Sequence, residues 1–179
     1  MPPKRWQAPR VPAELMPKLR VIVADDSEFM RIAYRRIFDT QPQVEVVGMA
    51  ENGAEAVKLA ADLEPDVAVL DIRMPELNGI EAAKRIVSER PGTGIVIISA
   101  YDDEEYIREL VKDGAEGKAY LLKTSVDEID ELISTVQAVA AGKTVLDPHI
   151  VRRLMRSDPD MAEILRAYDE QGSPDPSPR

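Results

Sequence analysis

The sequence contains no cysteine and a single histidine, His149. Without cysteine, disulfides, thiol nucleophiles and thiolate-bound metals are excluded. One imidazole leaves little room for a histidine-based metal site or a Ser-His-Asp triad. The chemistry of this chain must therefore come mainly from carboxylates, hydroxyls and amines.

Long apolar runs are missing as well. No stretch approaches the roughly 18 apolar residues that a membrane-spanning helix needs. The basic residues near the N-terminus are not followed by the apolar region of a secretory signal. We therefore expect a cytoplasmic protein without membrane contact. The net charge of -10 also argues against passive nucleic-acid binding by the whole chain, because the phosphates would repel it.

The 179 residues, of which 44% are hydrophobic, suit one domain with appendages. Residues 1–18 are rich in proline and predict a flexible leader. Residues 19–142 form the main domain, and residues 143–179 predict a helical extension with a disordered linker or tail. Asp147-Pro148 and Asp158-Pro159 each begin a short amphipathic helix in this extension. We expect its apolar faces to pack on the main domain or on a second copy, rather than on another partner.

Strands and helices alternate through the main domain. Short apolar runs rich in β-branched residues predict five buried strands. These strands are expected at residues 19–24, 44–50, 66–71, 95–99 and 120–122. A segment with helical periodicity follows each strand. This alternation indicates an α/β fold, a doubly wound parallel sheet of five strands with helices on both faces.

Polar side chains follow four of the five strands. Asp25 and Asp26 follow the first, and Asp71, Ser99 and Lys123 close the third, fourth and fifth. Each alone could be a helix cap, a turn residue or a solvated side chain. In a parallel sheet, however, all these ends lie at one edge, so three carboxylates, one hydroxyl and one ammonium group should converge on one crevice.

This combination of groups favours phosphoryl chemistry. Clustered carboxylates repel one another and need a cation, and oxygen ligands favour a hard ion such as Mg²⁺. A carboxylate can act as a nucleophile that forms an aspartyl phosphate. A lysine such as Lys123 can pair with the phosphate, and a hydroxyl such as that of Ser99 can donate a hydrogen bond to it.

With these residues, Met74-Pro75, Gly79 and Tyr120 complete a pattern. From about Lys18 to Gly142 the chain resembles the receiver domains of response regulators in two-component signalling. The resemblance implies a flavodoxin-like fold with strand order 2-1-3-4-5. It also implies that Asp71 is the phosphoacceptor, and that Asp25 and Asp26 hold Mg²⁺ together with Asp71.

The resemblance assigns roles to four further residues. The backbone carbonyl of Arg73 is an expected metal ligand, and Lys123 is the expected phosphate-binding lysine. Ser99 resembles the switch hydroxyl, and Tyr120 resembles the aromatic residue that turns inward when the hydroxyl moves. A sensor histidine kinase would supply the phosphoryl group. The chain would catalyse only its own phosphorylation and dephosphorylation, so it is not expected to be a conventional enzyme.

Two outputs fit the sequence. Residues 121–124 and 142–148 resemble the NarL/FixJ group of transcriptional regulators, which implies homodimerisation or partner binding through the fourth helix, fifth strand and fifth helix. DNA binding would then require a helix-turn-helix domain beyond Arg179. Alternatively, the chain is a stand-alone receiver that signals by protein contact without DNA.

The sequence departs in one detail from a class of phosphatases and in another from most receiver domains. Phosphatases of the haloacid dehalogenase type also form an aspartyl phosphate, but they require Asp-x-Asp after the first strand, and Asp25-Asp26-Ser27 does not supply it. Among receivers, the Gly-Ala-Glu-Gly run that ends at Gly117 is usually followed directly by the aromatic residue. Here Lys118 and Ala119 intervene, and we expect them beside the signalling surface.

Overall fold

The structure is a computed structural model that describes residue 12, residues 15–124 and residues 129–169. Most of the predicted leader and the end of the predicted tail therefore lie outside the described residues. The division of the chain after residue 142 stays a prediction.

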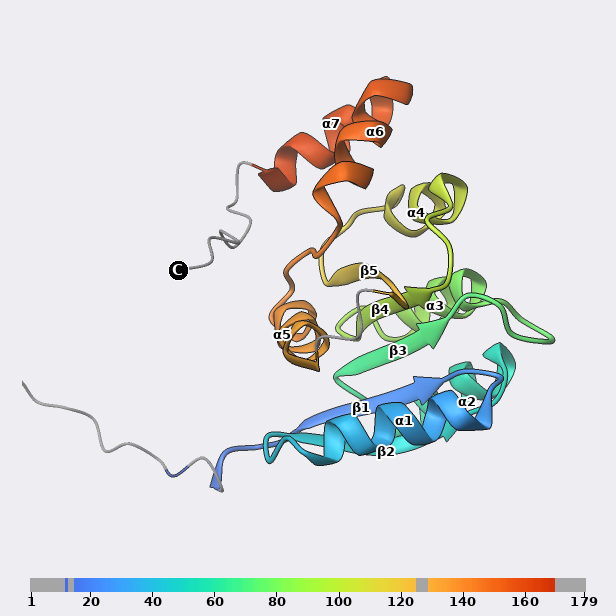
Figure 1. Cartoon of the computed structure of the whole chain (residues 1–179), viewed down its shortest axis with the longest axis vertical. Helices are drawn as coiled ribbons and strands as arrows, with labels where there is room; N and C mark the ends of the chain where they lie inside the picture. The colour runs from blue at the N-terminus through green and yellow to red at the C-terminus, as the bar shows by residue number, and fades with distance from the viewer. Residues whose placement is uncertain (1–11, 13–14, 125–128, 170–179) are drawn as a thin grey trace, which may run out of the picture.

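A single parallel sheet organises the chain (Figure 1), with the strand order β2-β1-β3-β4-β5. Its strands are β1 (Leu19–Ala24), β2 (Val44–Ala50), β3 (Val67–Asp71), β4 (Gly94–Ser99) and β5 (Lys118–Leu122). All neighbouring strands pair in parallel. The predicted fold class and strand order are confirmed.

Five helices cover the two faces of this sheet. They are α1 (Glu28–Asp39), α2 (Gly53–Leu63), α3 (Gly79–Glu89), α4 (Glu104–Val111) and α5 (Ile129–Ala140). Alternate residues of a strand face opposite sides, and β1 shows the result. Val21 and Val23 pack in the core under α1 and α5, whereas Ile22 and Ala24 pack in the core under α2, α3 and α4. The central strands are buried on both sides, so the carboxyl edge of the sheet is where polar side chains emerge.

The fifth strand begins earlier than predicted. Lys118 and Ala119 pair in regular register with Ile95 and Val96, so these two residues lengthen β5. The Lys118 ammonium donates to the carbonyls of Leu110 (2.9 Å) and Gly114 (2.7 Å) at the end of α4. A lysine at the start of a buried strand interrupts the apolar pattern, which explains why the sequence suggested a later start.

The extension contains two helices, α6 (Pro148–Ser157) and α7 (Pro159–Asp169). Before them, Val145 forms a parallel bridge with Ala119 and thereby adds to the edge of β5. The Asp147 carboxylate caps α6 by accepting hydrogen bonds from the amides of His149 and Ile150. Helix α6 lies beside α4 and α7 packs on α6 (Figure 1), so packing on the main domain is the arrangement that the structure shows. Within the described residues, no helix is long and apolar enough to cross a membrane.

Candidate functional site

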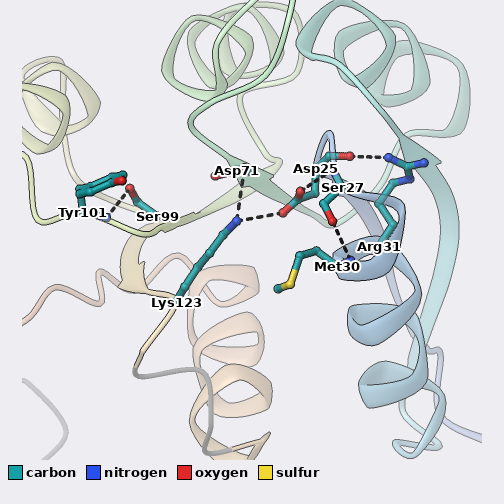
Figure 2. A network of polar contacts seen from close by, with 8 residues as sticks. All are labelled: Asp25, Ser27, Met30, Arg31, Asp71, Ser99, Tyr101 and Lys123. Atoms are coloured by element: carbon teal, nitrogen blue, oxygen red, sulfur yellow. Dashed lines mark hydrogen bonds and ion pairs between the residues drawn. The ribbon is translucent and has the colours of Figure 1, made fainter.

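Three carboxylates meet at the carboxyl edge of neighbouring strands, and Figure 2 draws two of them, Asp25 and Asp71. Asp25 and Asp26 follow β1, and Asp71 is the last residue of the adjacent strand β3. One oxygen from each carboxylate lies within 4.8 Å of the others. Asp25 is 1% exposed and Asp71 is 7% exposed, whereas Asp26 is open to solvent. The edge therefore holds two buried acids and one accessible acid.

Lys123 reaches this cluster from the end of β5. Its Nζ lies 3.3 Å from Oδ2 of Asp25 and 3.4 Å from Oδ2 of Asp71 (Figure 2). Burial raises the pKa of Asp71, Asp25 raises it further, and Lys123 opposes both effects. Partial burial lowers the pKa of Lys123, but Asp71 and Asp25 outweigh this effect and raise it. The single positive charge of Lys123 thus offsets only part of the negative charge of the three carboxylates.

The first turn of α1 fixes Asp25. Its Oδ1 accepts a hydrogen bond from the Ser27 amide (2.9 Å), and its backbone carbonyl accepts one from the Arg31 guanidinium (2.7 Å). Ser27 in turn caps α1 by accepting from the Met30 amide. A capped helix start thereby holds the carboxylate in place beside Asp71.

The donor set suits a hard divalent cation. Asp25, Asp26 and Asp71 provide oxygen ligands only, and clustered carboxylates are the usual anchors of protein-bound Mg²⁺. The guanidinium of Arg73 lies over the ring of Tyr101, 4.3 Å from its centroid. Because Arg73 follows β3 and Tyr101 follows β4, this contact joins the loops after the two strands. The proposed role of the Arg73 carbonyl stays a prediction.

Ser99 and Tyr120 lie in a separate group of contacts. The Ser99 Oγ accepts a hydrogen bond from the Tyr101 amide (3.1 Å), and Figure 2 shows Ser99 turned toward Tyr101. Tyr120 is 1% exposed, and its hydroxyl donates to the Tyr101 carbonyl (2.7 Å). The Lys123 backbone amide donates to the Ser99 carbonyl (2.7 Å), but within the described part of the chain no hydrogen bond joins the Ser99 hydroxyl to the side chain of Asp71 or Lys123. The structure thus brings together Asp25, Asp26, Asp71 and Lys123, and links Ser99 with Tyr120 through Tyr101.

Sequence reasoning missed Tyr34. This α1 residue is buried, and its hydroxyl has no hydrogen-bond partner among the described residues. Burial raises its pKa, and the charges of Asp25 and Asp71 raise it further. Its position four residues after Met30 and four before Phe38 was the available signal, since both neighbours lie on the inner face of α1.

The comparison with protein families agrees with the fold and with this acidic edge. Residues 21–137 match the family model described as the response regulator receiver domain. The chain therefore belongs to the receiver domain family of response regulators.

Curated relatives place it beside NarL- and DegU-type regulators. The transcriptional regulatory protein DegU of Brevibacillus brevis is 35% identical over 139 residues, which cover 78% of this chain and 57% of that protein. The oxygen regulatory protein NreC of Staphylococcus carnosus is 37% identical over 138 residues, which cover 76% of this chain and 62% of that protein. The chain thus spans less than two thirds of the length of these two relatives.

Solved structures give the same picture. The signal receiver domain of the putative response regulator NarL from Mycobacterium tuberculosis superposes with a TM-score of 0.65 at 34% identity. That match covers 72% of this chain and all of that chain. The response regulator domain of Thermotoga maritima CheB superposes with a TM-score of 0.63 at 36% identity, covering 69% of this chain and 97% of that chain. The NarL-like assignment from the sequence is confirmed.

Proposed function

We propose that this chain is the receiver of a response regulator that accepts a phosphoryl group on Asp71 from a sensor histidine kinase, in a reaction that depends on Mg²⁺. The observation that carries this proposal is the position of Asp71. It ends the central strand β3, its carboxylate pairs with Lys123, and two further carboxylates lie within 4.8 Å.

The step is a displacement at phosphorus. An Asp71 oxygen attacks the phosphorus atom of the donor's phosphohistidine, an O–P bond forms, and the P–N bond breaks as its electron pair returns to the imidazole. Asp25, Asp26 and Asp71 would hold Mg²⁺, which supplies positive charge next to the transferring phosphoryl group. Lys123 shifts from the Asp71 carboxylate to a phosphoryl oxygen and stabilises its charge.

The output is a change of surface. Ser99 leaves the Tyr101 amide and donates to the phosphoryl group, and the face of α4, β5 and α5 adjusts for dimerisation or partner binding. Because relatives such as DegU are transcriptional regulatory proteins, control of transcription is the favoured output, and DNA would be bound only if a helix-turn-helix domain lies beyond Arg179. The second candidate is a stand-alone receiver that acts in the cytoplasm through protein contacts. The observation in its favour is that the surface of α4 accommodates an amphipathic helix, which in this structure is the chain's own α6.

Acetyl phosphate tests the chemistry without a kinase. We expect the native chain, incubated with acetyl phosphate and Mg²⁺, to gain the mass of one phosphoryl group in intact-mass spectrometry and to lose that gain with a chelator. Lys123→Met keeps an unbranched apolar side chain but removes the charge. It should slow incorporation about 100-fold, as when one donor to a developing oxyanion is removed.

The matched control is Lys112→Met, which removes an exposed lysine at the end of α4. Its rate of incorporation should equal that of the native chain. A phosphoryl gain that persists in chelator, or a folded native chain that gains no mass, would contradict the proposal.

A further inference from the structure

The helices α6 and α7 bury apolar side chains in the same core cluster as α4 and β5, and α6 contacts α4 directly. Ile150 and Leu154 of α6, and Met161 and Leu165 of α7, are almost fully buried. They belong to the same core cluster as Ile107 and Leu110 of α4 and Tyr120 of β5. The extension therefore covers α4 and the inward-facing Tyr120, where the proposed switch must act.

Ion pairs attach α6 to the segment 100–104 and attach the junction between α6 and α7 to α4. The Arg153 guanidinium donates to the Asp102 carboxylate (3.3 Å) and to its backbone carbonyl (3.1 Å), and it also pairs with Glu104. Asp158, between α6 and α7, pairs with Arg108 of α4 (3.1 Å). Asp102 and Glu104 lie in the segment 100–104 that directly follows Ser99, so α6 is bound to the loop after the proposed switch hydroxyl.

The same short segment also contacts the switch residues. The Tyr101 amide donates to Ser99, and the Tyr101 carbonyl accepts from Tyr120. A phosphoryl group on Asp71 that draws in Ser99 must break the first of these bonds and move the segment toward Asp71. Because Asp102 is the next residue, the movement displaces one anchor of Arg153. Phosphorylation and the docking of α6 therefore make competing demands on residues 99–104.

We propose that α6–α7 is an intramolecular cover of the α4–β5 surface, held on the segment 100–104 by Arg153 and released when Asp71 is phosphorylated. The inference rests on the proposed function for the phosphorylation step. A chain whose cover is loosened beforehand populates the uncovered conformation more often, so it should also accept the phosphoryl group more readily. Release of the cover frees the α4–β5 surface for dimerisation or partner binding.

Hydrogen exchange measures the docking directly. We expect the amides of residues 148–166 to exchange about tenfold faster after treatment with acetyl phosphate and Mg²⁺, and no faster in Asp71→Asn treated in the same way. Intact mass from the same sample reports whether Asp71 was phosphorylated. A sample that gains no phosphoryl mass contradicts the proposed function, whereas one that gains it without faster exchange contradicts the cover.

Arg153→Met tests the anchor in the unphosphorylated chain. Exchange in residues 148–166 should rise about threefold to fivefold, a range set by the modest strength of partly exposed ion pairs. The rate of phosphorylation by acetyl phosphate should rise by a similar factor. Arg156→Met removes an exposed arginine from the same helix and should change neither quantity. Equal exchange and equal rates in the two variants would overturn the role of Arg153.

Discussion

Asp71→Asn is expected to stabilise the folded chain in the presence of a chelator while it abolishes phosphorylation. Burial and the neighbouring Asp25 raise the pKa of Asp71, which means that its ionised form is disfavoured in the fold. As the pH rises above the pKa of this carboxyl in the unfolded chain, the folded state bears a growing cost of ionisation, which is complete above the higher pKa of the carboxyl in the fold. The amide has nearly the same shape without the charge, so we expect the free energy of unfolding by urea to rise, by about 1 kcal/mol as for a typical single substitution.

With Mg²⁺ in place of the chelator, the native chain should be more stable than Asp71→Asn. A cation that binds the native acidic cluster more tightly than the variant stabilises the native chain by mass action. Asp62→Asn removes an exposed carboxylate from α2 and serves as the control, with no change beyond about 0.5 kcal/mol in chelator. If Asp71→Asn is less stable than the native chain in chelator, the electrostatic account of the cluster is wrong.

Gly79→Ala is expected to destabilise the fold where the start of α3 meets the end of β3. Gly79 begins α3, and its amide donates to the Ile72 carbonyl (2.9 Å). A Cβ at this position would lie 2.1 Å from the backbone carbonyl oxygen of Asp71. The end of β3 cannot give way without moving Asp71, so we expect the free energy of unfolding to fall by about 3 kcal/mol.

Gly92→Ala is the matched control. A Cβ at Gly92 meets no atom within 4 Å, and the residue lies in a turn after α3. Its free energy of unfolding should stay within about 0.5 kcal/mol of the native value. Equal stabilities for the two variants would show that the close approach of α3 to β3 is not a constraint.

The fold was largely predictable because its signals are local. The runs at 19–24 and 44–50 are mostly apolar, with one charged residue each (Arg20 and Glu45), and are bounded by polar residues, and the structure places β1 and β2 at those bounds. The start of β5 was missed because Lys118 is charged, and its satisfaction by the carbonyls at the end of α4 is a tertiary contact. Tyr34 was missed because arginines surround it in the sequence.

The acidic cluster could be predicted from the residues at the strand ends, but the contacts of Ser99 could not. In a parallel sheet, topology alone brings Asp25, Asp71 and Lys123 to one edge. Nothing local indicates that Ser99 binds the Tyr101 amide. Likewise, Arg153 and Asp102 are charged surface residues that lie 51 positions apart, and only the packing of α6 on α4 selects this pair.

Locating the phosphoryl group on the chain shows directly whether Asp71 is the acceptor. Borohydride reduces an acyl phosphate of aspartate to homoserine, so chain treated with acetyl phosphate and Mg²⁺ can be reduced, digested and mapped by peptide mass spectrometry. We expect homoserine at position 71 and at none of the positions of the other aspartates. Homoserine at position 25 or 26, or at any aspartate away from the acidic cluster, would contradict it.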